Sequence, residues 1–175
     1  MDRAGKSIVL IGMMGAGKSS VGRLLQRRTG LARFDTDEMV ATKFAASIPE
    51  IFSIHGEEKF REAETEALRE LADKEAAIIV TGGGIVLRDK NVDLLKQMGI
   101  VVWLEASVET LFERASRRRN RPLLQTEDPR ATLAEMLHKR MPLYAKAADM
   151  RVETTKLTHH EVADIVLAEI ERRNG

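Results

Sequence analysis

The 175-residue sequence contains no cysteine, and no apolar run approaches the roughly 20 residues that a membrane span needs. The missing cysteines exclude a disulfide framework and a thiolate metal site. Because 28 basic residues face 27 acidic ones, the net charge of +1 gives no general attraction to nucleic acid or membranes. The polar N-terminal segment does not resemble a signal peptide. Hydrophobic residues make up 43% of the chain, which suits one compact domain with its own core.

Residues 12–19 read G-M-M-G-A-G-K-S and directly follow the apolar run at 8–11. They match G-x-x-x-x-G-K-[ST], the phosphate-binding loop that joins a strand to a helix. Glycines let backbone N–H groups curl around phosphate oxygens, Lys18 supplies a positive charge for the β- and γ-phosphates, and the Ser19 hydroxyl can bind Mg²⁺. Apolar spacing over 18–29 provides the helix that must follow. The motif therefore predicts a nucleotide site.

Short apolar runs alternate with longer helical patterns along the chain, with no internal repeat. We expect strands at Ser7–Ile11, Ala32–Asp35, Ala77–Thr81, Ile100–Leu104 and Met150–Glu153. Helices are expected near 18–29, 36–45, 57–74, 90–98, 107–118, 129–145 and 158–173. This alternation predicts an α/β fold of three layers, with a central five-stranded parallel sheet between helices. Ligands in such folds bind beyond the carboxyl ends of the strands.

Asp35 and Asp37 stand where the second predicted strand ends. Two carboxylates at such a position can divide two roles: one binds Mg²⁺, and the other orients or deprotonates a substrate hydroxyl. The alternative is that either aspartate caps the helix that follows. Alone, the two interpretations are equally good, but the nearby phosphate-binding loop favours a functional role.

Three further segments carry weaker signals. Gly82, Gly83 and Gly84 follow the third predicted strand and suggest that the backbone approaches a ligand closely, although a strand-end turn is the alternative. Arg61 shares a helix face with Glu64, which fits an ordinary surface ion pair better than a site. Arg140 lies late in a helical pattern and by itself indicates little.

A basic run, Arg117 to Arg119 followed by Arg121, precedes the break at Pro122. It fits a mobile lid that brings an arginine to a transferring phosphoryl group, a nucleic-acid patch, or simply a solvated charge run. No aromatic residue is interleaved with it, which argues against stacking on bases. The histidines lack metal-ligand spacing, and we interpret them as surface or capping residues: His55, His138, His159 and His160.

The order of these motifs resembles the shikimate kinase family, within the nucleoside monophosphate kinase-like P-loop fold. The matching segments are G-M-M-G-A-G-K-S-S-V-G-R-L-L, F-D-T-D, I-F-S-I-H-G-E-E-K-F-R-E-A-E, T-G-G-G, R-N-R-P-L-L and K-R-M-P-L-Y. The resemblance implies ATP-dependent phosphorylation of the 3-hydroxyl of shikimate, with Mg²⁺. It also implies one kinase domain over 1–175, with the shikimate-binding part near 36–63 and a lid near 115–127. We expect a cytoplasmic monomer that binds neither nucleic acid nor membranes.

The resemblance also implies roles for single residues. Those for nucleotide are Gly12, Met13, Met14, Gly15, Ala16, Gly17, Lys18, Ser19, Ser20, Arg114 and Arg121, and those for Mg²⁺ are Ser19 and Asp35. Those for shikimate are Asp37, Arg61, Gly82, Gly83, Gly84 and Arg140, of which the two arginines grip its carboxylate. Lys18, Asp37 and Arg121 are the expected catalytic residues. The run 117–119 makes the lid unusually basic.

Other classes remain as alternatives. A gluconate kinase or a nucleoside monophosphate kinase shares the loop and the lid, and gluconate also carries a carboxylate. Neither needs two arginines for one carboxylate together with the D-T-D segment. A GTPase-like switch requires an N-K-x-D motif, which the sequence lacks. An RNA-binding module is disfavoured by the net charge of +1.

Overall fold

The computed structural model describes residues 6–118 and 122–175. Within these ranges the strands form one five-stranded sheet in the order β2-β3-β1-β4-β5, and every neighbouring pair is parallel. The strands are β1 (Ser7–Ile11), β2 (Ala32–Asp35), β3 (Ala77–Val80), β4 (Gly99–Glu105) and β5 (Met150–Glu153). The predicted parallel sheet is confirmed, with boundaries within one residue of those expected.

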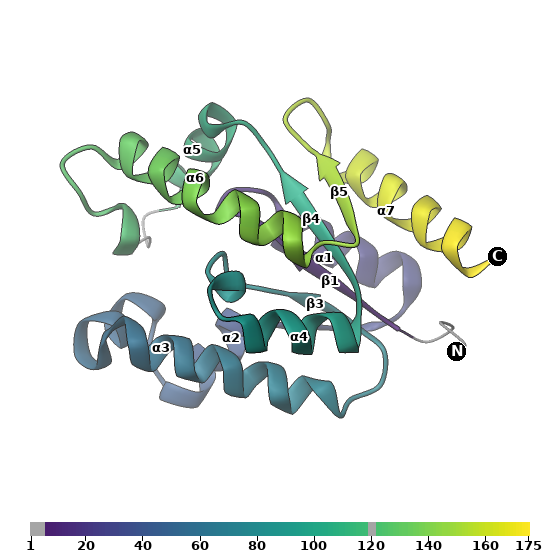
Figure 1. The fold of residues 1–175 in the computed structure, drawn as a ribbon, viewed down its shortest axis with the longest axis horizontal. Coiled ribbons are helices and arrows are strands. Elements are labelled where there is room, and N and C mark those ends of the chain that lie inside the picture. The colour runs from purple at the N-terminus through teal and green to yellow at the C-terminus, as the bar shows by residue number, and fades with distance from the viewer. Residues whose placement is uncertain (1–5, 119–121) are drawn as a thin grey trace.

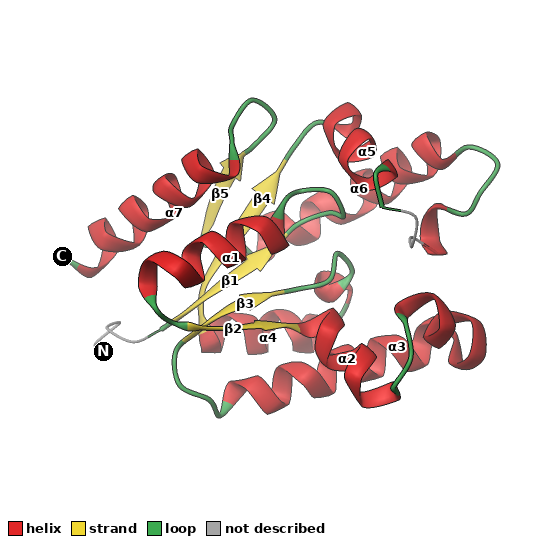
Figure 2. Cartoon of the chain, turned by 180° about the vertical axis from the view of Figure 1, so that it is seen from behind, coloured by secondary structure: helices red, strands yellow, loops and turns green. Residues whose placement is uncertain are grey.

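Helices cover both faces of this sheet (Figure 1). They are α1 (Lys18–Thr29), α2 (Thr36–Phe44), α3 (Ile48–Ala72), α4 (Asp89–Met98), α5 (Val108–Ser116), α6 (Pro129–Ala147) and α7 (His159–Asn174), with short 3₁₀ helices at Ile85–Leu87 and Pro122–Leu124. Seen from behind, α1 and α7 lie over one face, while α3, α4 and α6 lie on the other (Figure 2). The three-layer prediction is therefore confirmed.

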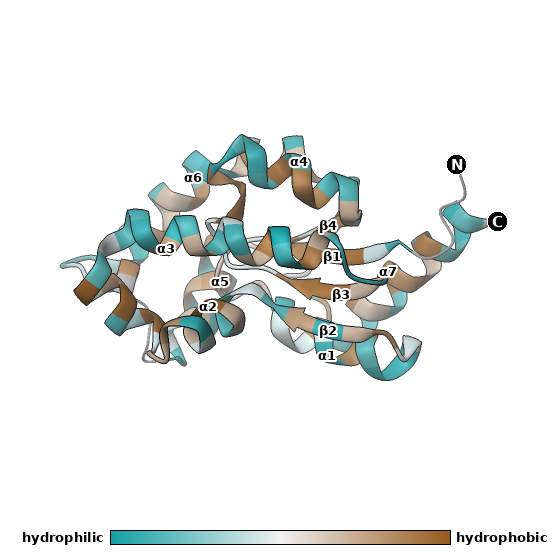
Figure 3. Ribbon diagram, turned by 90° about the horizontal axis from the view of Figure 1, so that it is seen from below, coloured by the Kyte–Doolittle hydropathy of each residue, from teal (hydrophilic) through white to brown (hydrophobic). Residues whose placement is uncertain are grey.

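The core lies between the sheet and the inward faces of the helices, and the strands stand out as apolar between more polar helices (Figure 3). Every residue of β1 and β3 is buried. Val9 of the central strand β1 pairs with Ile79 on one side and with Val101 on the other. Strands covered on both faces need continuous apolar sequence, which explains why these runs were recognisable.

Helix α3 differs most from the sequence prediction, which began at residue 57. It begins at Ile48, where the Ser47 hydroxyl and the Glu50 carboxylate form a capping box. Gly56, with φ 81° and ψ 168°, then interrupts the helix, and Phe60 and Arg61 lie beyond the interruption. This backbone conformation is accessible almost only to glycine. The glycine conceals the segment of the helix before it, about a third of its length, in the sequence pattern.

The phosphate-binding loop follows β1, the strand at which the order of the sheet changes direction. The chain passes from β1 to the edge strand β2, and it later adds β4 on the opposite side of β1. Parallel sheets bind ligands at such a switch point, beyond the carboxyl ends of the strands. None of the helices in the described ranges combines the length and the hydropathy that a membrane span requires.

Candidate functional site

The phosphate-binding loop is held in an open curl by its own residues. Gly15 and Gly17 have φ angles of 84° and 93°, which favour glycine. The buried Lys18 Nζ donates hydrogen bonds to the carbonyl oxygens of Gly12, at 2.6 Å, and Met13, at 2.9 Å. These bonds draw the loop around the ammonium group. Helix α1 begins at Lys18, so the positive end of its dipole faces the same space.

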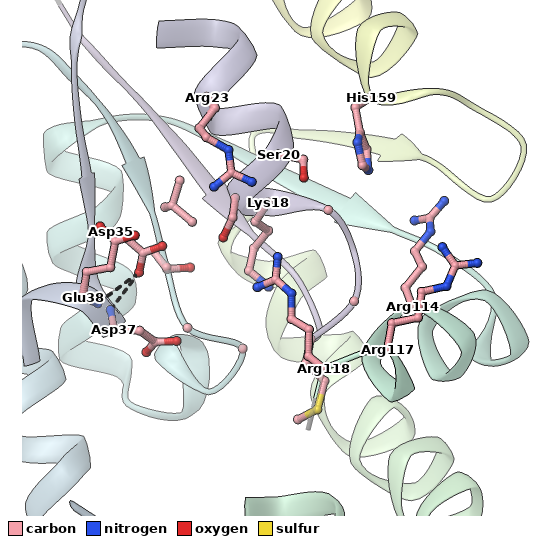
Figure 4. A pocket seen from close by; sticks show the side chains of 18 residues that line it. Lys18, Ser20, Arg23, Asp35, Asp37, Glu38, Arg114, Arg117, Arg118 and His159 are labelled. Atoms are coloured by element: carbon pink, nitrogen blue, oxygen red, sulfur yellow. Dashed lines mark hydrogen bonds between the residues drawn. The ribbon is translucent and has the colours of Figure 1, made fainter. Parts of the chain in front are cut away.

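A cleft of about 460 Å³ opens over this loop (Figure 4). Most of its charged lining is basic. The lining residues from the loop and α1 are Met14, Gly15, Gly17, Lys18, Ser19, Ser20 and Arg23. The opposite walls include Arg114, Arg117, Arg118 and His159, and the acidic groups are Asp35, Asp37 and Glu38. A cleft with fixed N–H donors and several cations suits a polyphosphate.

Asp35 fulfils one of the two roles that its sequence position suggested, that of helix cap, while binding of Mg²⁺ stays a prediction. Its Oδ1 accepts hydrogen bonds from the backbone N–H of Asp37, at 3.0 Å, and of Glu38, at 3.4 Å, so it caps α2. Its Oδ2 lies 3.8 Å from Arg33 Nη1. Burial raises the pKa of Asp35 to about 6, and the charges of Asp37 and Glu38 also raise it. A buried carboxylate with two acidic neighbours has a strong electrostatic preference for a cation.

A second, smaller pocket of about 100 Å³ adjoins the first. It is lined by two arginines, two carboxylates, the glycine segment and an apolar wall: Met14, Asp37, Ile48, Phe52, Phe60, Arg61, Glu64, Gly82, Gly83, Gly84, Leu123 and Arg140. Four of these residues, Met14, Asp37, Gly82 and Gly83, also line the larger cleft. Asp37 therefore lies where the two spaces meet.

The two arginines of this pocket are both only 6% exposed. Arg61 Nη1 donates to Glu64 Oε2 at 2.7 Å, and Arg61 Nη2 donates to Glu57 at 3.2 Å. The interpretation of Arg61 and Glu64 as a surface ion pair is therefore wrong, because α3 packs this face inward. Buried guanidinium groups are costly unless something pairs with them, and a carboxylate matches their planar fork. A pocket with two such groups can bind a small anion.

Two buried polar atoms in this pocket make no hydrogen bond within the described part of the chain: Arg61 Nε and Glu64 Oε1. Burial raises the pKa of Glu64 to about 7, although the charge of Arg61 acts in the opposite direction. Buried polar atoms without partners are uncommon and often mark a ligand position. Their location beside Arg140 agrees with a polar ligand.

The glycine segment allows these groups to come together. A Cβ atom on Gly82 would lie 2.7 Å from Asp37 Oδ1 and 2.8 Å from Glu64 Oε1, and one on Gly84 would collide with the Arg61 guanidinium. No side chain fits at either position. We expected the glycine backbone to approach a ligand closely, and the structure shows it approaching the site residues Asp37, Glu64 and Arg61 closely. The Tyr144 hydroxyl donates to the Gly83 carbonyl at 2.5 Å and fixes the segment from α6.

The structure thus brings most of the predicted residues together in two adjoining spaces, whereas Gly12, Met13 and Ala16 belong to the loop but line neither space. Arg114, expected beside the nucleotide, lines the cleft and donates to Oγ1 and the carbonyl of Thr154, both at 3.3 Å. Arg121 lies outside the described residues. Sequence analysis missed Tyr144, although it follows Arg140 by four residues and so shares its helix face. His159 is exposed, as expected of a surface residue, and it also lines the cleft, which sequence analysis did not predict.

Comparisons with known proteins agree with this geometry. The family model for shikimate kinase matches residues 14–171. A shikimate kinase of Thermodesulfovibrio yellowstonii is 46% identical over 167 residues, which cover 95% of this chain and 96% of that protein. A shikimate kinase of Bordetella avium is 48% identical over 147 residues, covering 84% of this chain and 70% of that protein.

Solved structures give the same result. Shikimate kinase from Acinetobacter baumannii, in complex with shikimate, has a TM-score of 0.94 and 40% identity, and the match covers 98% of this chain and 96% of that one. A gluconokinase from Sinorhizobium meliloti, with a TM-score of 0.61 and 19% identity, covers 99% of this chain and 95% of that one and shares the fold alone. The phosphate-binding cleft that meets a two-arginine pocket agrees with these relatives. The family model and the relatives together show that the chain belongs to the shikimate kinase family.

Proposed function

We propose that this protein transfers the γ-phosphoryl group of ATP to the 3-hydroxyl of shikimate, giving shikimate 3-phosphate and ADP in the biosynthesis of aromatic amino acids. The observation that carries the proposal is the position of Asp37. It lines both the cleft over the phosphate-binding loop and the pocket that holds Arg61 and Arg140. A hydroxyl next to Asp37 would therefore face the donor, while a carboxylate on the same molecule faces the arginines.

The acceptor pocket matches a ring that carries hydroxyls and one carboxylate. Arg61 and Arg140 each offer a planar set of N–H donors, which suits bidentate binding of a carboxylate. Glu64 holds the Arg61 guanidinium in place at 2.7 Å. Phe52 and Phe60, whose ring centroids lie 4.8 Å apart, form an apolar wall for the carbon skeleton.

The donor cleft has the groups that a nucleoside triphosphate with Mg²⁺ requires. Ser19 offers a hydroxyl and Asp35 offers a buried carboxylate. Burial and the neighbouring acidic charges raise the pKa of Asp35, and a nearby cation would stabilise its ionised form. No group of three or more acidic, histidine or cysteine ligands occurs in the described ranges. The Ser19 hydroxyl and the Asp35 carboxylate fit Mg²⁺, which proteins usually hold with one or two side chains plus substrate phosphates. When bound, Mg²⁺ would neutralise charge on the phosphates.

In the proposed reaction, the 3-hydroxyl oxygen forms a bond to the γ-phosphorus as the bond from phosphorus to the β–γ bridging oxygen breaks. Asp37 orients the hydroxyl and accepts its proton, and ADP leaves with the bridging oxygen. Such transfers depend on positioning and charge neutralisation more than on covalent catalysis. Lys18 would supply part of that neutralising charge. Arg121, expected from the family resemblance to reach the phosphates, remains a prediction.

We further propose that residues near 36–63 form the shikimate-binding part of a single kinase domain over 1–175, and that residues near 115–127 act as a lid. Lid closure would exclude water, which otherwise competes with shikimate as acceptor. A cytoplasmic monomer without a nucleic-acid partner remains our expectation, and the balanced charge of +1 supports the last part of it.

The proposed function is tested by an assay that couples ADP release to a spectroscopic readout, with shikimate, gluconate and nucleoside monophosphates as separate acceptors. We expect kcat/KM for shikimate to exceed that for every other acceptor by at least about 100-fold, because the two buried arginines and the apolar wall together fit a carboxylate on a ring, which neither gluconate nor a nucleoside monophosphate offers. A greater value with gluconate or a nucleoside monophosphate would overturn the assignment.

A further inference from the structure

The run Arg117–Arg119 is the one motif of the sequence for which the family pattern gives no role. Its first two residues are described, and they follow the end of α5. The backbone N–H of Arg118 donates to the Ala115 carbonyl at 3.1 Å, so Arg118 is attached to the last turn of this helix. Its side chain therefore starts from a defined point on the wall of the nucleotide cleft.

Arg118 lines the same cleft as Lys18 and Ser19. Figure 4 shows its side chain extending from the end of α5 into the cleft, in the direction of Lys18. Lys18 belongs to the part of the motif that binds the β- and γ-phosphates. The Arg118 guanidinium thus points to the space that the terminal phosphates of a bound nucleotide would occupy.

The neighbouring arginines are engaged by other protein groups, whereas Arg118 is not. Arg117 Nη2 pairs with Glu113 at 2.6 Å, and Arg114 donates to Thr154. Within residues 6–118 and 122–175, the side chain of Arg118 makes no ion pair or hydrogen bond. A solvated charge at a helix end needs no partner, but this charge points into an anion-binding cleft rather than away from it.

We propose that Arg118 is an additional binding residue for the terminal phosphates of the nucleoside triphosphate, acting beside Lys18. The guanidinium donates hydrogen bonds to phosphate oxygens across the mouth of the cleft. A charge-assisted bond of this kind at a partly exposed site corresponds to about a tenfold change in affinity. The inference rests on the proposed nucleotide site, and it gives a role to one residue of the basic run.

The test is calorimetric titration of the protein, without acceptor, with ATP, ADP and adenosine. We compare wild type, Arg118→Gln, Arg118→Lys and the control Arg130→Gln. Arg130 pairs with exposed Glu109 at 2.7 Å and does not line the cleft, so this control removes the same charge elsewhere. Both glutamine variants should fold, because each changes an exposed side chain.

We expect Arg118→Gln to weaken ATP binding about tenfold, ADP binding less, and adenosine binding not at all. Arg118→Lys should recover most of the ATP affinity, since charge is the main contribution, and Arg130→Gln should change it less than twofold. Equal effects of Arg118→Gln and Arg130→Gln, or an equal loss for ATP and adenosine, would overturn the proposal. Because no acceptor is present, failure of the shikimate assignment would leave this result unaffected.

Discussion

Arg61 and Glu64 form an ion pair that is buried inside the protein: Arg61 Nη1 lies 2.7 Å from Glu64 Oε2, and the Glu64 side chain is fully enclosed. Both residues lie on the face of α3 that points toward Gly82 and Arg140. Glu64 and Glu57 fix the two terminal nitrogens of the guanidinium, and Arg61 Nε makes no hydrogen bond within the described part of the chain. The pair therefore prepares the pocket for an anion before any ligand arrives.

Replacing either arginine by lysine tests whether the two act together on a carboxylate. Arg61→Lys and Arg140→Lys should each raise KM for shikimate at least about tenfold, because a single ammonium cannot reproduce a bidentate contact. KM for ATP should change less than twofold. Steady-state kinetics with both substrates varied will measure this, with Arg172→Lys, which alters an exposed ion pair with Glu169, as control. Equal losses for ATP and shikimate would refute the shared role.

The pKa of Glu64 predicts how stability depends on pH. Burial raises this pKa to about 7 from the ordinary value of 4.5, so the folded protein binds a proton more tightly than the unfolded chain does. The contribution of Glu64 to the free energy of unfolding should therefore decrease as pH rises from 4.5 to about 7, and stay constant above that.

Chemical denaturation of wild type and Glu64→Gln at several pH values measures this contribution by difference. The wild type should lose more stability than the variant between pH 5 and pH 8, because glutamine does not titrate. Parallel curves would show that the pKa of Glu64 is ordinary. A wild type that gains stability relative to the variant would show that Arg61 lowers the pKa instead.

Asp37 is the residue on which the proposed chemistry depends most. Asp37→Asn should reduce kcat about 10²- to 10⁴-fold, because the amide cannot accept the proton of the hydroxyl. ATP should still bind with nearly unchanged affinity, as measured by calorimetry. The matched control is Asp89→Asn, which changes a surface carboxylate paired with Lys146 at 3.3 Å. Near-normal turnover in Asp37→Asn would remove this residue from the mechanism.

Tyr144 is predicted to act through the glycine segment. Burial raises its pKa to about 12, so its hydroxyl remains protonated and donates to the Gly83 carbonyl. Tyr144→Phe leaves that carbonyl without its donor, which costs about 1–3 kcal/mol and should raise KM for shikimate several-fold. KM for ATP should be preserved.

Trp103→Phe serves as the control for Tyr144→Phe, because the Trp103 ring stacks on Tyr144 at 5.7 Å without contributing to its hydrogen bond. It should lower the melting temperature but leave KM for shikimate nearly unchanged. If both variants raise KM equally, general loosening of the core explains the effect, and the positioning role of Tyr144 fails.

The sequence predicted the parts of the protein that depend on short stretches of chain. The phosphate-binding loop and the buried strands carry their own patterns, because the glycine spacing of the loop and short apolar runs alternating with helices are typical of this architecture. The importance of the second strand's end was also predictable from its two aspartates. In the structure, Asp35 caps α2 and lines the cleft.

What escaped prediction depends on packing between distant segments. The sequence of α3 is highly charged, and the Arg61 and Glu64 face becomes an interior one because α3 packs against the glycine segment and neighbouring helices. His159 lies 142 positions after Gly17, yet a Cβ atom on Gly17 would be 3.1 Å from its Nε2. The direction of the Arg118 side chain likewise follows from where α5 ends.

The central claim is that Arg61 and Arg140 select an acceptor by its carboxylate while its hydroxyl faces Asp37. It is tested most directly by comparing the dissociation constants of shikimate and its uncharged carboxamide, in wild type and in Arg140→Gln. We predict that wild type binds shikimate at least about 100-fold more tightly than the carboxamide, and that Arg140→Gln loses most of this difference. Equal binding of the two compounds by wild type would contradict the account.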